Sequence, residues 1–250
     1  MKKLTLIICL IVSSIYAQHA PVAEPVYGGY IEHLAAVPLS STETRVFIAP
    51  NSANSLFYID ISNVTTSPSY TSMNVVPDFS STANMGTIRK LTADENSHFA
   101  YAALSQGGLY GTDITSGSSF LIDSGFFEAL EAYDGILFAI VSNGGNLELH
   151  FGNIDPSTGA VSSFTNTTIA AVPSTPPRFD YDIVINPNND YVYIFVPGTS
   201  PVIYKSSDVY TSLSSSTTFS AITTSDLSSS GHDYAAMGIA PDGRIFALSY

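Results

Sequence analysis

Two carboxylates, Asp180 and Asp182, lie two residues apart directly before the apolar run 183–185. On an extended strand such residues point to the same side, because side chains alternate between the two faces. A carboxylate pair in this position could share a cation or a proton. Acid–base catalysis would also need a neighbouring group that separates the two pKa values. The alternative is that both carboxylates are simply solvated at the surface, and the sequence leaves both interpretations open.

Other charged or titratable side chains stand at corresponding places, at or just before the first apolar run of a repeated unit. If these first strands line a common channel, the residues form one of its rims. We predict that this rim binds a partner through the following residues: Glu32, His33, Arg89, Glu128, Arg178, Asp180, Asp182, His232 and Asp233.

Motifs of known catalytic chemistry are not found in the sequence. It contains no Gly-x-Ser-x-Gly elbow, no His-Glu-x-x-His motif, no phosphate loop and no dinucleotide-binding glycine pattern. Histidines 33, 98, 150 and 232 are far apart and lack the spacing of metal ligands. We therefore predict no catalytic residues, no metal site and no cofactor.

A strand–turn–strand unit recurs five times and must position the rim residues. The second strands of these units begin near Val46, Phe99, Leu137, Val192 and Ile245, at intervals of 53, 38, 55 and 53 residues. Third strands are predicted at 56–61, 108–114, 147–154 and 202–205. Fourth strands are predicted at 70–76, 119–123, 161–165 and 218–222.

Four antiparallel strands per unit at this period are typical of β-propeller blades, so we predict an all-β propeller. A β-sandwich would also contain many short strands, but the recurrence of one four-strand order favours the propeller. The predicted blades span approximately 30–77, 85–124, 126–168, 178–224 and 232–250. The fifth unit has only two strands. We therefore expect four complete blades and a half blade, an incomplete ring from a longer protein, with an unpaired edge at residues 245–248.

The first residues indicate export. Met1-Lys2-Lys3 is basic, residues 4–12 are apolar, and small residues lead to Ala17, so we predict a signal peptide at 1–17 and a linker at 18–29. The apolar segment is too short to span a membrane. We expect a secreted protein, extracellular or at the cell surface. Cys9, the sole cysteine, would leave with the signal, and the mature chain would then form no disulfide.

The charge of the chain limits its partners. Loss of the signal would leave six of the eight basic residues against 21 acidic ones. Such a surface cannot neutralise a run of phosphates or dock on an anionic bilayer. We predict an extracellular protein or glycan as partner, no nucleic acid, and no membrane insertion after signal cleavage.

Some hairpins resemble those of known propellers. The segments 113–117 (Asp-Ile-Thr-Ser-Gly) and 155–159 (Asp-Pro-Ser-Thr-Gly) resemble the hairpins between outer strands of secreted quinoprotein-like and YncE-like propellers. The segment from Ser206 resembles the Asp-box, Ser-x-Asp-x-Gly-x-Thr-Trp, of sialidase- and sortilin-type propellers. Ser206 and Asp208 match that pattern, whereas Tyr210, Ser212 and Leu213 replace its other residues.

These observations predict a non-enzymatic binding module. The alternative is a glycoside hydrolase or lyase of sialidase-like type that uses rim carboxylates. That alternative calls for a cluster of arginines, and only Arg45, Arg89, Arg178 and Arg244 are present. A third interpretation is a structural surface protein in which the propeller serves as a spacer. The sequence does not distinguish this protein from a binding module.

Overall fold

The computed structural model describes residues 31–50, 55–63, 69–71, 73–76, 79, 86–94, 96–173, 181–197, 201–222, 234–240 and 242–249. The predicted signal peptide and linker, 1–17 and 18–29, lie outside these residues. In the described part the chain forms β-strands and short 3-10 turns. No helix among the described residues has the length and apolar character needed to cross a membrane.

Four sheets share one order, in which the first four strands pair antiparallel in sequence; the first sheet adds a fifth strand, which pairs with its third. The first sheet contains β1 (Ile31–Pro38), β2 (Glu43–Pro50), β3 (Phe57–Ser62), and two short strands that both pair with β3, namely β4 (Ser69–Tyr70) and β5 (Asn74–Val75). The second contains β6 (Ile88–Ala93), β7 (Phe99–Leu104), β8 (Leu109–Asp113) and β9 (Ser119–Asp123).

The third sheet contains β10 (Ala129–Tyr133), β11 (Ile136–Asn143), β12 (Asn146–Asn153) and β13 (Thr165–Ala171). The fourth contains β14 (Asp182–Ile185), β15 (Tyr191–Val196), β16 (Val202–Val209) and β17 (Phe219–Ile222), with the 3-10 turn η2 (Tyr210–Ser212) after β16. The fifth contains β18 (Tyr234–Ile239) and β19 (Ile245–Ser249). Within the described residues β19 pairs with β18 alone.

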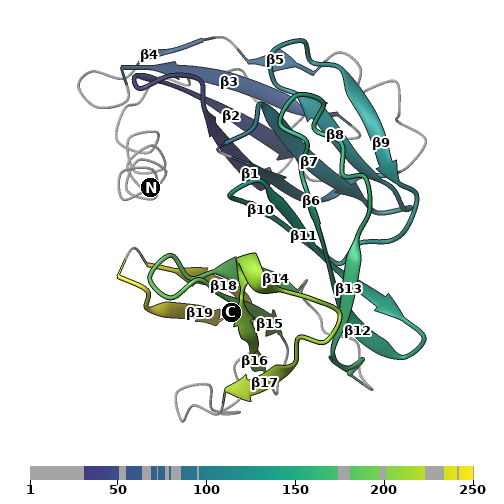
Figure 1. Ribbon diagram of the computed structural model, residues 1–250. Helices are drawn as coiled ribbons and strands as arrows, with labels where there is room; N and C mark the ends of the chain where they lie inside the picture. Colours follow the sequence, from purple (N-terminus) through teal and green to yellow (C-terminus); the bar gives the residue numbers. More distant parts are fainter. Residues whose placement is uncertain are drawn as a thin grey trace.

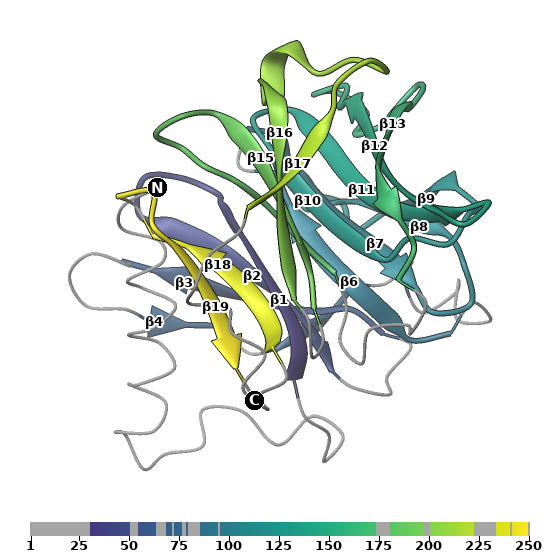
Figure 2. The same cartoon turned by 90° about the horizontal axis from the view of Figure 1, so that it is seen from below.

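The sheets follow one another around an axis, as Figures 1 and 2 show. The first strands β1, β6, β10, β14 and β18 are neighbours in that order. The fourth strands lie at the periphery, and the fifth sheet lies at the far end of this arc from the first sheet in Figure 1. The chain is therefore an all-β propeller of four-stranded antiparallel blades, and its described residues form four complete blades and two strands of a fifth. We number the blades in chain order.

Neighbouring blades bury apolar side chains between them. Separate clusters form between blades 1 and 2, 2 and 3, 3 and 4, and 4 and 5. The second strands contribute to the clusters on both of their faces, which is why all six residues of β7 are buried. Such double burial explains the continuous apolar runs of β7 and β15 in the sequence.

One strand prediction is wrong. The fourth strand of blade 3 was expected at 161–165, but β13 begins at Thr165 and ends at Ala171. The turn 155–159 returns the chain so that Val161 forms an isolated bridge with Ile154. A Cβ on Gly152 would lie 2.5 Å from the carbonyl oxygen of Ser163. The missing side chain of Gly152 therefore lets the backbone of Ser163 lie close to β12, although the two segments do not pair as strands there. Regular pairing with β12 resumes only at Thr165.

Two hairpins contain the same aspartate turn, and each also contacts the preceding blade. In both, an aspartate side chain accepts hydrogen bonds from the next backbone N–H groups: Asp113 from Thr115 (2.7 Å) and Asp155 from Ser157 (2.8 Å). The hydroxyl of Tyr101 in blade 2 donates to the carbonyl of Gly159 (3.1 Å). The Asp-x-x-x-Gly pattern therefore builds contacts between blades as well as a turn.

Gly159→Ala tests this docking. Gly159 has φ +68°, and a Cβ there would lie 2.3 Å from the ring of Phe99. Gly144 has a similar φ of +57° with no atom within 4 Å of that position, so Gly144→Ala is the matched control. We expect the control to lose about 1 kcal/mol from the left-handed backbone alone, and Gly159→Ala to lose roughly 1–3 kcal/mol more from the clash. Urea unfolding measures both, and equal losses would contradict close packing on Phe99.

Candidate functional site

The first strands of blades 2, 3 and 4 bring three charged side chains together. Lys90 of β6 places its Nζ 3.4 Å from Oδ1 of Asp182, the first residue of β14. The other oxygen of Asp182, Oδ2, accepts a hydrogen bond from the backbone N–H of Met237 on β18 (2.8 Å). Glu131 of β10, between β6 and β14, is close enough to feel the charge of Asp182. We call Lys90, Glu131 and Asp182 the inner-strand cluster.

One carboxyl group of this cluster has a strongly raised pKa. Burial is the largest cause of a rise in the pKa of Glu131 to about 8; the neighbouring Asp182 carboxylate contributes to this rise, and a hydrogen bond with Thr92 opposes it. Glu131 is therefore mainly protonated at neutral pH and can donate a hydrogen bond. The partners of Asp182 are the ammonium group of Lys90 and the backbone N–H of Met237.

A second ion pair adjoins the cluster. Nη2 of Arg89 lies 2.6 Å from Oε2 of Glu128, directly before β10. Arg89 is the extra residue of a β-bulge, because Ile88 pairs with Leu104 and Lys90 with the next residue, Ala103. A bulge redirects a side chain, so the consecutive residues Arg89 and Lys90 reach different partners.

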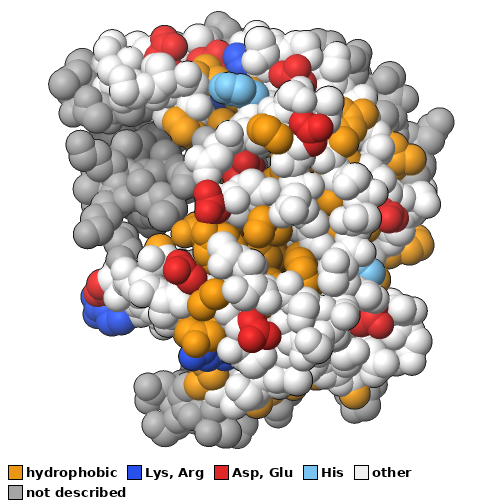
Figure 3. Space-filling model, viewed as in Figure 1, with side chains coloured by type: hydrophobic (Ala, Val, Ile, Leu, Met, Phe, Trp, Pro, Cys, Tyr) orange, Lys and Arg blue, Asp and Glu red, His pale blue; other side chains and the backbone are white. Residues whose placement is uncertain are grey.

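The ring of Tyr181 lies near this pair. Burial raises the pKa of Tyr181, with a contribution from the charge of Glu128 and an opposing one from Arg89. In Figure 3, hydrophobic side chains gather near the middle of the face, around β10 and β14, and acidic groups are scattered about them. A buried aromatic ring and charged groups are thus adjacent at the beginnings of these strands.

The structure brings some of the predicted rim residues together and not others. Arg89 and Glu128 are in contact, and Asp182 joins the inner-strand cluster. His33 is half-buried on β1, and Glu32 is the bulged residue of that strand. Four predicted residues lie outside the described part of the chain: Arg178, Asp180, His232 and Asp233. The predicted pairing of Asp180 with Asp182 therefore stays a prediction.

Sequence reasoning missed Lys90 and Glu131. Lys90 follows a residue that was selected, and Glu131 interrupts the apolar stretch Ala129-Leu130-Glu131-Ala132. A charged residue inside an otherwise buried first strand is the signal that could have identified Glu131. Within the described ranges no three His, Cys, Asp or Glu side chains come together in a way that could hold a metal ion.

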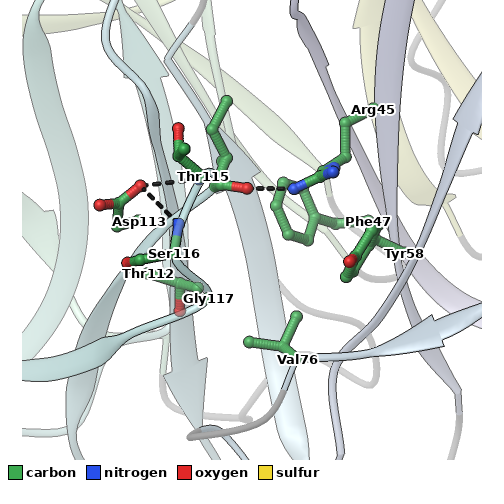
Figure 4. Close-up of a pocket in the computed structure, with 10 residues that line it drawn as sticks. Arg45, Phe47, Tyr58, Val76, Thr112, Asp113, Thr115, Ser116 and Gly117 are labelled. Carbon is green, nitrogen blue, oxygen red and sulfur yellow. Dashed lines mark hydrogen bonds between the residues drawn. The ribbon is translucent and has the colours of Figure 1, made fainter.

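A different cavity, of about 80 Å³, opens between blades 1 and 2 (Figure 4). Arg45 of β2 lies against it and forms a two-bond ion pair with Asp60 (2.7 and 2.8 Å). The same guanidinium group donates to the carbonyl of Ile114 in the blade 2 hairpin and covers the ring of Tyr58 at 4.0 Å. Its charge is thus already neutralised, and we interpret Arg45 as a link between blades rather than as an anion site.

Neither a protein-family model nor a curated protein matches the chain. Among solved structures, a protein from Lactobacillus plantarum is similar with 15% identity and a TM-score of 0.49, over 89% of this chain and 67% of that one. The β-propeller domain of the Trilobed protease from Pyrococcus furiosus, described as having an open velcro topology, is similar with 10% identity and a TM-score of 0.43, over 89% and 79%. The sheet arrangement of this chain itself, rather than either neighbour, establishes its fold.

Glu131 makes stability depend on pH. Its pKa is 4.5 in the unfolded chain and about 8 in the folded one, so the folded state holds more protons between these values. The free energy of unfolding should therefore fall as pH rises from 4.5 to 8, by at most about 1.4 kcal/mol per pH unit. Glu131→Gln should remove this slope. Asp182→Asn removes the neighbouring charge and should lower the pKa of Glu131 in the folded state. The slope should then end at a lower pH than in the wild type.

Thermal unfolding of the three proteins between pH 5 and 8.5 measures this dependence. A slope that persists unchanged in Glu131→Gln would show that another group causes it.

Proposed function

We propose that the protein is a secreted, non-enzymatic β-propeller that binds an extracellular protein or glycan at the rim formed by the beginnings of its first strands. The supporting observation is the arrangement of Lys90, Glu131 and Asp182 next to the Arg89–Glu128 pair. It offers an ammonium group, the protonated carboxyl of Glu131 and the carboxyl group of Asp182 on three neighbouring first strands. Donors and acceptors of hydrogen bonds are what a hydroxylated or peptide ligand requires.

The same contacts favour binding over turnover. A glycoside hydrolase would need a carboxylate that is available as base or nucleophile beside a proton-donating acid. Glu131 could donate, but both oxygens of Asp182 already face partners, Lys90 and the N–H of Met237. Attack through Asp182 would first break these interactions. We therefore infer that the cluster holds a ligand rather than cleaving it.

The fold also supports this role. Each first strand lies in a sheet held by apolar clusters, so the rim side chains are carried by a preformed scaffold. We further propose that the chain is allied with the secreted quinoprotein-like and YncE-like propellers, or with degenerate Asp-box propellers. In favour of the latter, Asp208 accepts a hydrogen bond from Thr217 within its own hairpin (2.7 Å).

A double variant, Arg89→Ala with Glu128→Ala, tests rim binding. Removing Arg89 and Glu128 together avoids leaving either charge of this ion pair without the other, so we expect the fold to remain intact. A glycan array and a panel of extracellular proteins first identify a ligand. We then expect the double variant to weaken binding by at least about tenfold.

The matched control is Arg244→Ala with Asp242→Ala, which removes an exposed ion pair (2.7 Å) in the turn between β18 and β19. This control should bind as the wild type does. Turnover of chromogenic glycosides that disappears in an Asp180→Asn, Asp182→Asn variant would overturn the proposal in favour of the hydrolase or lyase alternative.

A further inference from the structure

A groove of about 300 Å³ lies between the outer parts of blades 3 and 4. Blade 3 contributes the first residue of β11, the end of β12, Ser162, Ser163 and Thr165, and blade 4 contributes Tyr210, Thr211 and Leu213. None of these residues belongs to the inner-strand cluster or the predicted rim. The volume lies at the lower end of the range of small-molecule sites, roughly 300–1,000 Å³.

The groove has an apolar floor and polar walls. Ile136, Phe151 and Leu213 form the floor and belong to the edge of the core shared by blades 3 and 4. The walls carry four exposed hydroxyl groups and one exposed amide, from Ser162, Ser163, Thr165, Thr211 and Asn153. None of the ten lining residues is charged.

One wall is an aromatic ring held in place. The hydroxyl of Tyr210 donates to Oδ2 of Asp134 (2.6 Å), and its backbone N–H donates to the carbonyl of Asp190 (2.7 Å). Its ring also meets the ring of Tyr133 edge-on, with centroids 5.2 Å apart. Because Tyr210 is already fixed by blade 3, a ligand that packs on it would lose little side-chain entropy.

The opposite wall is the irregular segment that replaces the first part of the predicted fourth strand. Gly152 lets the carbonyl of Ser163 approach β12 closely. Residues 162–164 therefore lie beside β12 outside the regular ladder, with the side chains of Ser162 and Ser163 exposed. The departure from strand geometry thus creates the hydroxyl-rich wall.

We propose that this groove binds a neutral sugar unit. A sugar ring combines an apolar C–H face, which fits Tyr210 and the floor, with hydroxyls that can exchange hydrogen bonds with the walls. An anionic ligand would lose hydration without meeting a cation, in a protein of net charge −13. A cation would find no carboxylate in the lining, and a purely apolar ligand would leave the wall hydroxyls without partners.

The test is an NMR titration of the isotope-labelled protein with methyl glycosides of neutral hexoses and of N-acetylglucosamine, with methyl glucuronide for comparison. We expect saturable shifts at the amides of Gly152, Ser163 and Thr211, with weaker binding of the glucuronide. Thr211→Trp, which places bulk in the groove from an exposed position, should raise the dissociation constant at least about tenfold.

Thr218→Trp is the matched control, because Thr218 is also exposed in blade 4 but does not line the groove. It should change the dissociation constant by less than about twofold. No saturation by any neutral glycoside, or saturation only by an extended peptide, would overturn the proposal. Shifts that persist in the Arg89→Ala, Glu128→Ala variant would support a binding site separate from the rim. Shifts that disappear in that variant but persist in Thr211→Trp would refute binding in the groove.

Discussion

The burial of each sheet against its neighbours is the constraint on which the rest of the structure depends. A single four-stranded sheet has two faces, and the second strands here are apolar on both, as in β7 and β15. Such a strand is stable only when another sheet covers each face. Stacking the blades around an axis meets this requirement and brings β6, β10 and β14 side by side. The positions of Lys90, Glu131 and Asp182 therefore follow from core packing elsewhere in the blades.

The elements that the sequence predicted well are those with a periodic apolar pattern and clear turns. The fourth strand of blade 2 was predicted at 119–123 and lies at Ser119–Asp123, and the second strand near Phe99 begins at that residue. The prediction of a strand at 161–165 was wrong. Val161 is buried, as a strand residue would be, but it pairs with the chain only through a single bridge to Ile154. Burial pattern alone does not distinguish a bridge from a strand.

For the site, position within the repeat identified Arg89, Glu128 and Asp182 but not their contacts. Lys90 and Asp182 are 92 residues apart in the chain, and their contact depends on the stagger between blades. The bulge that separates the directions of Arg89 and Lys90 also leaves no mark in the residue pattern. Local sequence therefore predicts which strand bears a group, whereas the partner of that group is set by tertiary packing.

The hairpin contacts also have a direction along the chain. Arg45 of blade 1 donates a hydrogen bond to the hairpin of blade 2, and Tyr101 of blade 2 donates one to the hairpin of blade 3. Asp134 of blade 3 accepts one from Tyr210 of blade 4. In each case the surface on which the hairpin docks belongs to the preceding blade in the sequence. During synthesis from the N-terminus, that surface exists before the segment that docks on it emerges, and repeat proteins propagate structure between nearest neighbours. The residues of each docking surface are thus synthesised before the hairpin that packs on them.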